Sequence, residues 1–527
     1  MSETSNQQNK VGGGGSKRLI SIILVIVLII GVGITTYAFL NKSEKEKYFL
    51  AEKKSSEFIM DQIEQRFGHE LEWNEKKKNN PVEASHEFSA QFDGGASFSA
   101  GLFSPEQIIN NSSITLTTAS DLDNKVVSGG ISGNFAGIEI DDIRYYLTSD
   151  EFLMDYPFLD ETLQIKEEDV GYIFNSVDPY STDDDFEIDF DTIFEWMQGF
   201  YSEEDKGYFQ DEYLPMIYDK LPEDAFQSDK ESITVKGESI NAEKLTMHLS
   251  EADVKDLLSS LFEKMKNDEY IKKGLEKLYD FGNLGEAVDT TAEYSVEDLI
   301  KEYEDGLEEV LENMDELYIP DGLTSTIWVN KNLIVQRDFS LEIGEGEEIF
   351  GSITLKGTQL LEDDEQSFDY ELTVEDDYDQ ETVFFVGEST VDEKETTDSI
   401  ELLIDETTIG YESTEAVNDN KKEFDRTISV EDYGVETKIL WSGNATYEED
   451  QMSSEHELRA EDPTLSDVEM FSLLIDKKAE LVKSIELPSD DNKKDLGSMD
   501  STELMNYFEY EFPELFEEWM FGNMNAW

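Results

Sequence analysis

The segment from Leu19 to Leu40 is the feature that most restricts how this chain can fold. It reads LISIILVIVLIIGVGITTYAFL, 22 residues without a charged side chain, and Lys17 and Arg18 come directly before it. As a helix it would be about 33 Å long, which matches the roughly 30 Å hydrocarbon core of a bilayer. The run predicts one transmembrane helix over 19–40. The alternatives are a buried core helix or a cleaved signal peptide, whose apolar region is usually only about 7–15 residues long.

The tail before this run is short and carries more positive than negative charge. Glu3 is its one acid, against Lys10, Lys17 and Arg18. Long domains are translocated largely regardless of their charge, so the short tail is expected to remain in the cytoplasm. We therefore predict a single-pass protein of the cell membrane, with a cytoplasmic N-terminus and an extracytoplasmic C-terminal domain.

Acidic side chains dominate the composition. The chain has 123 Asp and Glu against 41 Lys and Arg, for a net charge of -82, and it has no cysteine. Phosphate backbones are bound by clustered cations, so nucleic acid is not an expected partner. Without cysteine, disulfides, thiolate metal sites, cysteine nucleophiles and a lipoprotein anchor are excluded. Diffuse binding of divalent cations to the acidic surface is the only cofactor-like interaction expected. Low cysteine content is common in proteins exported by Gram-positive bacteria.

Helical periodicity predicts a stalk near the N-terminus and two central helices, of which the central helices are the clearest. Residues 43–78 read as a helical stalk in which Gly68 is a plausible C-cap. Ser250 with Asp253 and Ser295 with Asp298 resemble capping boxes, and each precedes an apolar stripe at helical spacing. A further helix is expected near 466–485, and an aromatic one over 504–521. Between the helices, alternation of apolar and polar residues predicts strands over about 87–174 and again after 326.

The strands after residue 326 read as an antiparallel meander with one apolar and one wet face. Apolar runs recur at 368–374, 383–386, 400–404, 427–430 and 437–441, and acidic turns divide them. The predicted fold class is α+β, with an N-terminal transmembrane helix followed by curved antiparallel sheets packed on a central pair of amphipathic helices. The expected units are a cytoplasmic tail (1–18), the transmembrane helix (19–40), a helical stalk and hinge (41–80), a mainly β part (81–245), a helical insert (246–320), the meander (321–462) and C-terminal helices (463–527).

No motif for catalysis or metal binding stands out. The four histidines, at 69, 86, 248 and 456, have no metal-ligand spacing, and no GxSxG elbow or phosphate-binding glycine loop occurs. The acidic run from Asp183 to Asp191 offers oxygens that calcium prefers, but the EF-hand register is absent, so a solvated loop is the simpler interpretation. Paired carboxylates are too common here to nominate a glycosidase dyad. The sequence predicts that the protein is not an enzyme, and that it has no catalytic, cofactor-binding or metal residues.

The order of elements resembles a pattern of envelope proteins. Strands lead through NAEKLTM, residues 241–247, into two amphipathic helices, and TIWVNK, residues 326–331, opens further strands. This layout resembles the lipoprotein-carrier class, in which an open antiparallel sheet curls around a helical plug. It also resembles the uncharacterised single-span surface proteins of Bacillus-type Firmicutes, a family defined by a domain of unknown function. The resemblance implies no particular site residues.

The leading hypothesis is a membrane-anchored extracytoplasmic envelope protein that binds an apolar ligand or a protein partner without catalysis. The alternatives are an extracellular sensor or scaffold for cell-wall processes, and a hydrolase without a recognisable motif. A ligand cavity would form where the sheet curls round the central helices, and a sealed core is the competing interpretation. Periodicity nominates the following apolar lining: Leu258, Leu261, Trp328, Phe339 and Leu341.

Overall fold

The computed structural model describes residues 43–92, 105–136, 138–177, 188–197, 203–286, 295–376, 379–463 and 471–524. Its main feature is one continuous sheet of 21 strands. Hydrogen-bonded neighbours run in the order β7, β8, β10 to β20, β1 to β6 and β21, and β9 pairs at the edge of β11. All of these pairs are antiparallel except β6 with β21. At about 4.8 Å per strand, the sheet is on the order of 90 Å long.

The first nine strands are β1 (Val82–Phe92), β2 (Ser113–Asp121), β3 (Val126–Phe135), β4 (Ile138–Thr148), β5 (Glu151–Asp155), β6 (Thr162–Lys166), β7 (Phe226–Val235), β8 (Glu238–Leu249) and β9 (Leu317–Tyr318). The meander continues through β10 (Leu323–Asn330), β11 (Leu333–Glu345), β12 (Glu348–Leu361), β13 (Glu365–Asp376), β14 (Gln380–Asp392) and β15 (Glu395–Ile404). The last strands are β16 (Thr407–Asn418), β17 (Lys421–Asp432), β18 (Val435–Tyr447), β19 (Gln451–Glu461), β20 (Phe471–Leu481) and β21 (Lys493–Asp495).

Tight turns with positive φ fix the register of the meander. Tyr433 and Gly434 join β17 to β18 with φ of 49° and 76°, and Asp432 pairs with Val435 across them. Two consecutive residues with positive φ are the signature of the hairpin turn that matches the twist of antiparallel strands. The meander predicted after residue 321 is therefore present, and its strands follow one another without a crossover.

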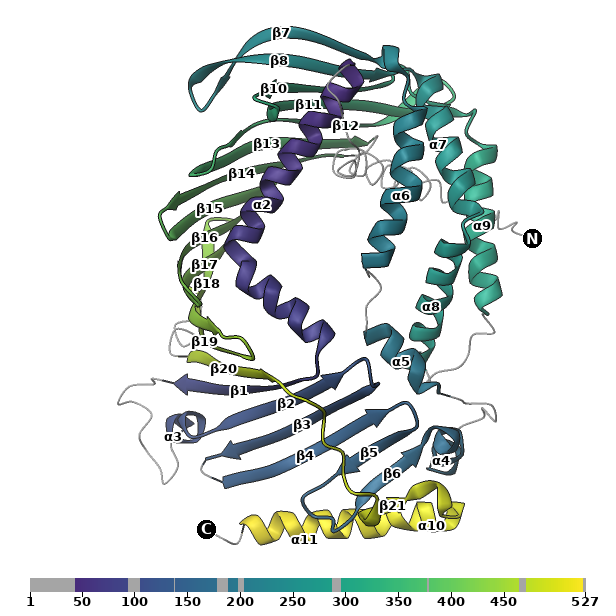
Figure 1. Cartoon of the computed structure of the whole chain (residues 1–527), viewed down its shortest axis with the longest axis vertical. Coiled ribbons are helices and arrows are strands. Elements are labelled where there is room, and N and C mark those ends of the chain that lie inside the picture. The colour runs from purple at the N-terminus through teal and green to yellow at the C-terminus, as the bar shows by residue number, and fades with distance from the viewer. Residues whose placement is uncertain are drawn as a thin grey trace, which may run out of the picture.

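One long helix, α2 (Glu44–Asn79), runs along the inner face of the curved sheet (Figure 1). Ser43 caps its first turn: its side chain accepts a hydrogen bond from the Glu46 amide, and the Glu46 carboxylate accepts one from the Ser43 amide. Pro81 follows its end, where the residue before a proline avoids the helical region. The predicted cap at Gly68 is instead a kink, because Phe67 has non-helical dihedrals and the helix continues. The predicted stalk thus lies against the sheet.

The remaining helices of the described chain lie at the two ends of the molecule and along the side opposite the middle strands (Figure 1). They are α3 (Pro105–Asn110), α4 (Val170–Val177), α5 (Phe190–Met197), α6 (Glu203–Lys220), α7 (Glu251–Lys266), α8 (Glu269–Glu286), α9 (Val296–Glu312), α10 (Ser501–Asn506) and α11 (Phe512–Met524). The capping boxes at Ser250 and Ser295 are confirmed as the starts of α7 and α9.

The largest core lies where α2, α6 and α7 meet strands β7 to β12. Its fully buried members include Phe49 from α2, Leu258 from α7 and Leu341 from β11. Two smaller cores at the other end join β3 to β6 with α4, α5 and α10. Between these ends, the inner face of the sheet is covered mainly by α2.

The predicted fold class is wrong. In the described residues a single sheet dominates, rather than an α+β arrangement of sheets around a central helical pair, and α2 is the helix that lies along it. The helix predicted at 466–485 is also wrong, because β20 occupies Phe471–Leu481. That strand pairs with β19 on one side and β1 on the other, and so joins the two halves of the chain into one sheet. Such a long-range pairing leaves no local signal in the sequence.

The predicted single-pass topology and cell-membrane localisation also need correction. No helix within the described ranges is both long enough and apolar enough to cross a membrane. The tail 1–18 and the predicted span from Leu19 to Leu40 lie outside those ranges. The described part of the structure therefore gives the membrane assignment no support.

Candidate functional site

Contacts with α2 define which side chains face inward. Arg66 of α2 reaches Asp398 on β15 and Glu415 on β16, and Lys422 on β17 reaches Glu70 of α2. Side chains alternate between the two faces of a strand, and paired residues share a face. The registers are continuous from β14 to β20, so every second residue of these strands can be assigned to the inner face.

An apolar stripe lies on this inner face beside α2. Its cross-strand neighbours form ladders in which one apolar side chain pairs with the next. One ladder runs Phe385, Leu402, Ile409, Val430; a second runs Tyr411, Ile428, Ile439; a third runs Trp441, Leu458, Leu473, Ala90; a fourth runs Ile475, Phe88, Ile114; and a fifth runs Leu116, Ile131, Ile143. We call these residues the inner stripe. Because it crosses eleven strands, β14 to β20 and β1 to β4, it extends over roughly 48 Å.

Much of the inner stripe remains accessible to solvent. Ile114 is 52% exposed, Ile131 46% and Ile439 43%, whereas core residues such as Leu341 are 1% exposed. Val430, Leu473 and others along the stripe are exposed to a similar degree. Scattered apolar side chains are normal on a protein surface, but a continuous row of them marks a binding surface.

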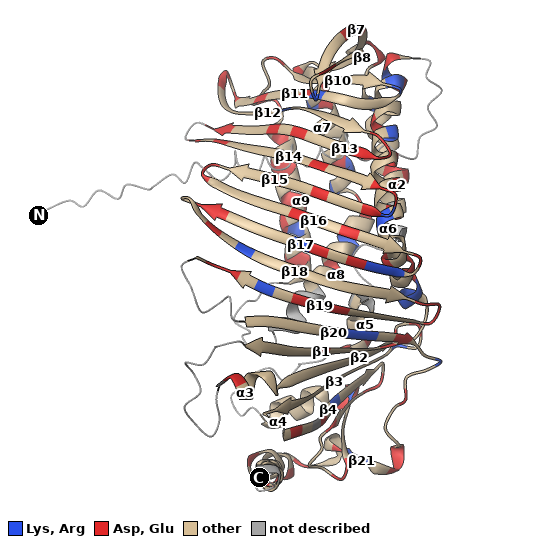
Figure 2. Cartoon of the chain, turned by 90° about the vertical axis from the view of Figure 1, so that its left-hand side faces the viewer, with Lys and Arg blue, Asp and Glu red and all other residues tan. Residues whose placement is uncertain are grey.

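The outer face of the same strands is polar. Figure 2 looks onto this side of the sheet, where acidic positions recur from strand to strand. The alternation places there, for example, the carboxylates Glu401, Glu412, Glu423, Glu457 and Glu480. Phe384 and Val386 are exceptions, being outward and exposed. The two faces of the sheet therefore differ: acidic side chains recur on the outer face, and an exposed apolar row lies on the inner face.

Buried ion pairs hold α2 over the inner face. The Arg337 guanidinium donates to both carboxylate oxygens of Glu52 at 2.7 Å. Further along, Arg66 donates to Asp398 at 3.0 Å and to Glu415 at 2.9 Å. Fork-like pairs of this kind fix orientation as well as distance.

Glu415 is the centre of the second group. Its side chain is 1% exposed, and it also accepts hydrogen bonds from Arg426 at 2.6 and 3.0 Å. Lys422, 3% exposed, lies 3.2 Å from it. Burial by itself raises the pKa of the Glu415 carboxyl, but the hydrogen bond from Arg66 and the charges of Arg66 and Lys422 outweigh burial and lower the pKa to about 2. These charges are internally satisfied, so they position α2 rather than offer a reactive group.

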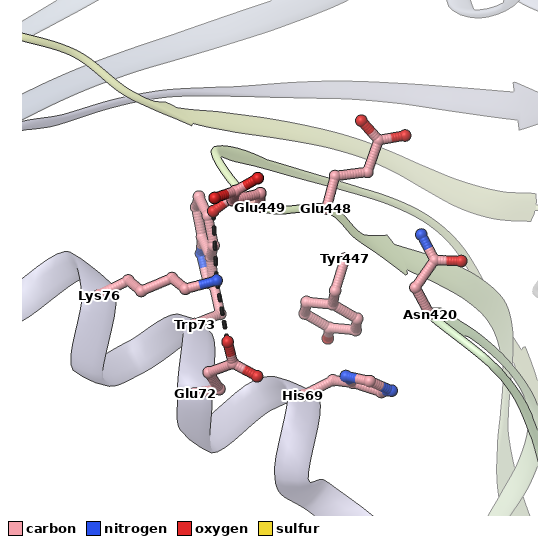
Figure 3. Close-up of a pocket in the computed structure, with 8 residues that line it drawn as sticks. All are labelled: His69, Glu72, Trp73, Lys76, Asn420, Tyr447, Glu448 and Glu449. Atoms are coloured by element: carbon pink, nitrogen blue, oxygen red, sulfur yellow. Dashed lines mark hydrogen bonds and ion pairs between the residues drawn. The ribbon is translucent and has the colours of Figure 1, made fainter.

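A polar pocket of 470 Å³ lies at the edge of the sheet near the end of α2 (Figure 3). The His69 ring stacks on Tyr447 with centroids 5.8 Å apart, and its Nε2 lies 2.7 Å from the Asp419 carbonyl oxygen. Lys76 pairs with Glu72 at 3.0 Å and donates to the Glu449 carbonyl at 3.2 Å. Trp73, whose buried indole Nε1 has no hydrogen-bond partner among the described residues, also lines it. Polar side chains dominate this lining, so the pocket does not provide the apolar lining predicted from the sequence.

The sequence-predicted lining residues are all buried. Leu258, Leu261, Phe339 and Leu341 share the largest core, where each is at most 5% exposed. Trp328 belongs to a separate cluster with Ile233 and Val335, and its indole donates to Glu231 at 3.0 Å. The structure thus brings four of the five together and places the fifth elsewhere. The inner stripe was missed as a site, although the alternating runs at 383–386, 400–404, 427–430 and 437–441 were visible in the sequence.

The remaining site predictions concern metals and the acidic run. Within the described ranges no group of three or more His, Asp or Glu side chains is arranged to hold a metal ion. Residues 183–187 of the acidic run lie outside those ranges. His86, His248 and His456 lie on different strands, and no two of them meet in a common site.

Comparisons with known proteins give no family. No family model matches the chain, and no curated protein matches its sequence. Solved structures with a similar arrangement include Pseudomonas aeruginosa OccK3 (OpdO), with 5% identity and a TM-score of 0.25 over 76% of this chain and 95% of that one. Salmonella typhi OmpF in complex with daunomycin has 8% identity and a TM-score of 0.23 over 77% of this chain and 99% of that one. A mutant of the Rh. blastica porin has 8% identity and a TM-score of 0.22 over 76% of this chain and 98% of that one. Likeness at these TM-scores carries no argument about function.

Proposed function

We propose that this protein is a non-enzymatic binding protein for an elongated apolar ligand, such as the acyl chain of a lipid. The observation that carries the proposal is the inner stripe: a continuous, part-exposed apolar row on the inner face of a sheet whose outer face is acidic. At roughly 48 Å it is about three times as long as the ~15 Å of chain that one leaflet of a bilayer contains. Each buried methylene contributes about 0.8 kcal/mol, so a long chain gains enough to bind.

The shape of the surface favours a chain over a compact ligand. The stripe is one or two side chains wide along each strand and many strands long. Its aliphatic and aromatic side chains offer no fixed set of polar groups that would select a small polar molecule. The buried ion pair between Arg66 and Glu415 keeps α2 beside the inner stripe. The helix therefore forms one wall along the stripe.

The test compares two neighbouring residues of β18 that face opposite sides. Ile439 lies on the inner stripe and Leu440 faces outward, because they are consecutive in one strand. A carboxylate at position 439 would have to be desolvated beneath an acyl chain, so Ile439→Asp should weaken binding of a fluorescent fatty acid about tenfold or more. Leu440→Asp carries the same change of charge and should leave the affinity within about twofold of wild type.

The measurement is a titration of the purified full-length chain with micromolar fluorescent fatty acid, with native mass spectrometry to detect lipid that copurifies. Circular dichroism establishes that both variants are folded. The proposal fails if the wild-type chain neither carries lipid nor binds the probe. It also fails if Ile439→Asp and Leu440→Asp weaken binding equally.

A further inference from the structure

Three basic side chains gather on the inner face where α2 ends. His86 on β1 and Lys477 on β20 are direct cross-strand partners. Lys77 lies in the last turn of α2, which comes down to these two strands (Figure 1). All three side chains are half-buried. Chain segments far apart in the sequence therefore place three basic groups together, and we call them the basic cluster.

Within the described ranges, the two lysines of the basic cluster lack acidic partners. In the described part of the chain, neither Lys77 nor Lys477 has a carboxylate within ion-pair distance, although their neighbours Lys76 and Lys78 pair with Glu72 and Glu75. Acids outnumber bases in this protein by 123 to 41, so lysines without an acidic partner are unexpected. Asp476 and Glu480 are close in sequence, but the alternation of β20 turns them to the outer face.

Burial disfavours the charged form of every member of the basic cluster, and the charge of a neighbouring lysine adds to this effect for Lys77 and His86. Burial lowers the pKa of Lys477. Burial, and then the charge of Lys477, lower the pKa of Lys77, while burial and both lysines lower the pKa of His86. Cations that are partly desolvated and close together are destabilising unless an anion neutralises them. The protein does not supply that anion at this place within its described residues.

Neighbouring titratable groups of the inner face, His456, Arg426 and Glu70, are already engaged. His456 accepts a hydrogen bond from the Trp441 indole at 3.2 Å through Nδ1, and its Nε2 lies 3.0 Å from the Ser454 hydroxyl. Arg426 is bound to Glu415, and Glu70 of α2 to Lys422. Among the described residues, these engaged groups leave the basic cluster without a neutralising anion.

The basic cluster adjoins the inner stripe. Phe88 follows His86 by two residues on the same face of β1, and Leu116 pairs with His86 from β2. On β20, Ile475 lies two residues from Lys477 on the same face. An anionic group held by the cluster would therefore have apolar side chains directly beside it, on the same surface.

We propose that Lys77, Lys477 and His86 bind the anionic head group, a carboxylate or phosphate, of an amphiphile whose acyl chain lies on the inner stripe. This inference rests on the proposed function and adds the class of ligand. The head group neutralises the lysines, and the acyl chain supplies the apolar contact. With a net charge of -82, the protein repels anions in general, so a local cation cluster is needed to admit one.

The experiment compares ligands that share a chain but differ in head group. Binding of palmitate and of hexadecanol to the full-length chain is measured by calorimetry at pH 7 and fixed ionic strength. Palmitate should bind about tenfold more tightly than hexadecanol, as expected when a charged group gains an unpaired partner. The double variant Lys77→Met and Lys477→Met should remove that preference and leave hexadecanol binding unchanged, because methionine keeps the aliphatic stem.

Matched controls are available one residue away. Lys78 is exposed on α2 and Lys478 faces outward on β20, so Lys78→Met with Lys478→Met makes the same change of net charge. These changes should leave the preference for palmitate intact. If both double variants reduce palmitate binding equally, the effect is one of overall charge, and the basic cluster is not the site.

Other outcomes separate this inference from the proposed function. If palmitate and hexadecanol bind equally to the wild-type chain, the head-group site is refuted while the function of the inner stripe stands. If neither binds, both are refuted. Inorganic phosphate and acetate form a third arm: saturable binding of either one without a chain, lost in the Lys77→Met, Lys477→Met variant, would show a site for a free anion and overturn the amphiphile.

Discussion

Two parts of the sheet differ in how far their inner face is covered: the upper part, β7 to β12, and the lower part, from β14 through β20 and β1 to β4 (Figure 1). Around β7 to β12, helices α2, α6 and α7 close over the sheet, and side chains such as Phe49, Leu258 and Leu341 are fully buried. From β14 to β4, α2 covers only part of the width, and apolar side chains beside it stay exposed. The strands have similar alternation in both parts. What differs is whether a second layer of apolar helix is present to bury the face.

The hold on α2 differs in the same way. In the upper part α2 contributes Tyr48 and Phe49 to the core, in addition to Glu52, which forms the ion pair with Arg337. In the lower part it contributes Arg66 and Glu70 to buried ion pairs, and only Trp73 to a small apolar cluster. Apolar packing stabilises without direction, whereas ion pairs fix orientation but contribute less net stability. The upper part is thus built to be sealed, and the lower part to hold a helix at a set distance from an open surface.

Truncating the sealed core should give the largest loss of stability. Phe339 is 5% exposed within the large core, so Phe339→Ala should lower the free energy of unfolding by about 3–5 kcal/mol, the transfer cost plus that of the cavity. Guanidinium unfolding of the full-length chain measures this. A loss below about 1 kcal/mol would show that the upper core is already loosely packed and would remove the contrast with the lower part.

Breaking the buried ion pairs should come next. Arg66→Met would leave Asp398 and Glu415 buried with fewer cations, an arrangement that typically costs about 3 kcal/mol or more. Lys54→Met is the control on the same helix, because Lys54 pairs with Glu57 on the surface, where such pairs contribute about 0–1 kcal/mol. Equal losses in the two variants would contradict the role of Arg66 in holding α2.

Acid should weaken the lower part through Glu415. Its pKa is lowered from 4.5 to about 2 in the folded protein, so its contribution is complete above pH 4.5 and is lost as pH falls toward 2. The stability difference between wild type and Glu415→Gln should therefore be constant from pH 7 to 5 and shrink between pH 4.5 and 2. Comparing the two proteins cancels the titration of the other acids. A difference that does not depend on pH would contradict the assignment.

Truncating the open stripe should have the smallest effect on stability. Ile439 is 43% exposed, so Ile439→Ala should change the free energy of unfolding by less than about 1 kcal/mol, in contrast with Phe339→Ala. The same change should measurably weaken binding of a fluorescent fatty acid. A loss of several kcal/mol would mean that another part of the chain buries Ile439 in solution, and the open surface would not exist.

Local patterns in the sequence determined the elements that depend on local physics. The capping boxes at Ser250 and Ser295 begin α7 and α9, and the alternating runs after residue 326 form the meander with its apolar and polar faces. These succeed because a cap satisfies nearby backbone groups, and because alternation sorts side chains whenever a strand forms. The sequence also showed the acidic excess that the outer face carries.

Only the tertiary structure decided how those elements combine. The pairing of β20 with β1 joins two regions into one sheet. This pairing is why a strand, and not the predicted helix, occupies most of 466–485. That assembly brings Lys77 close to Lys477 and His86. It also decides that Leu258 and Phe339 are buried while Ile439 stays exposed. Burial and charge pairing depend on which distant segment covers a face. No local pattern encodes that choice, so the sequence predicted an apolar face but not which part of it stays open.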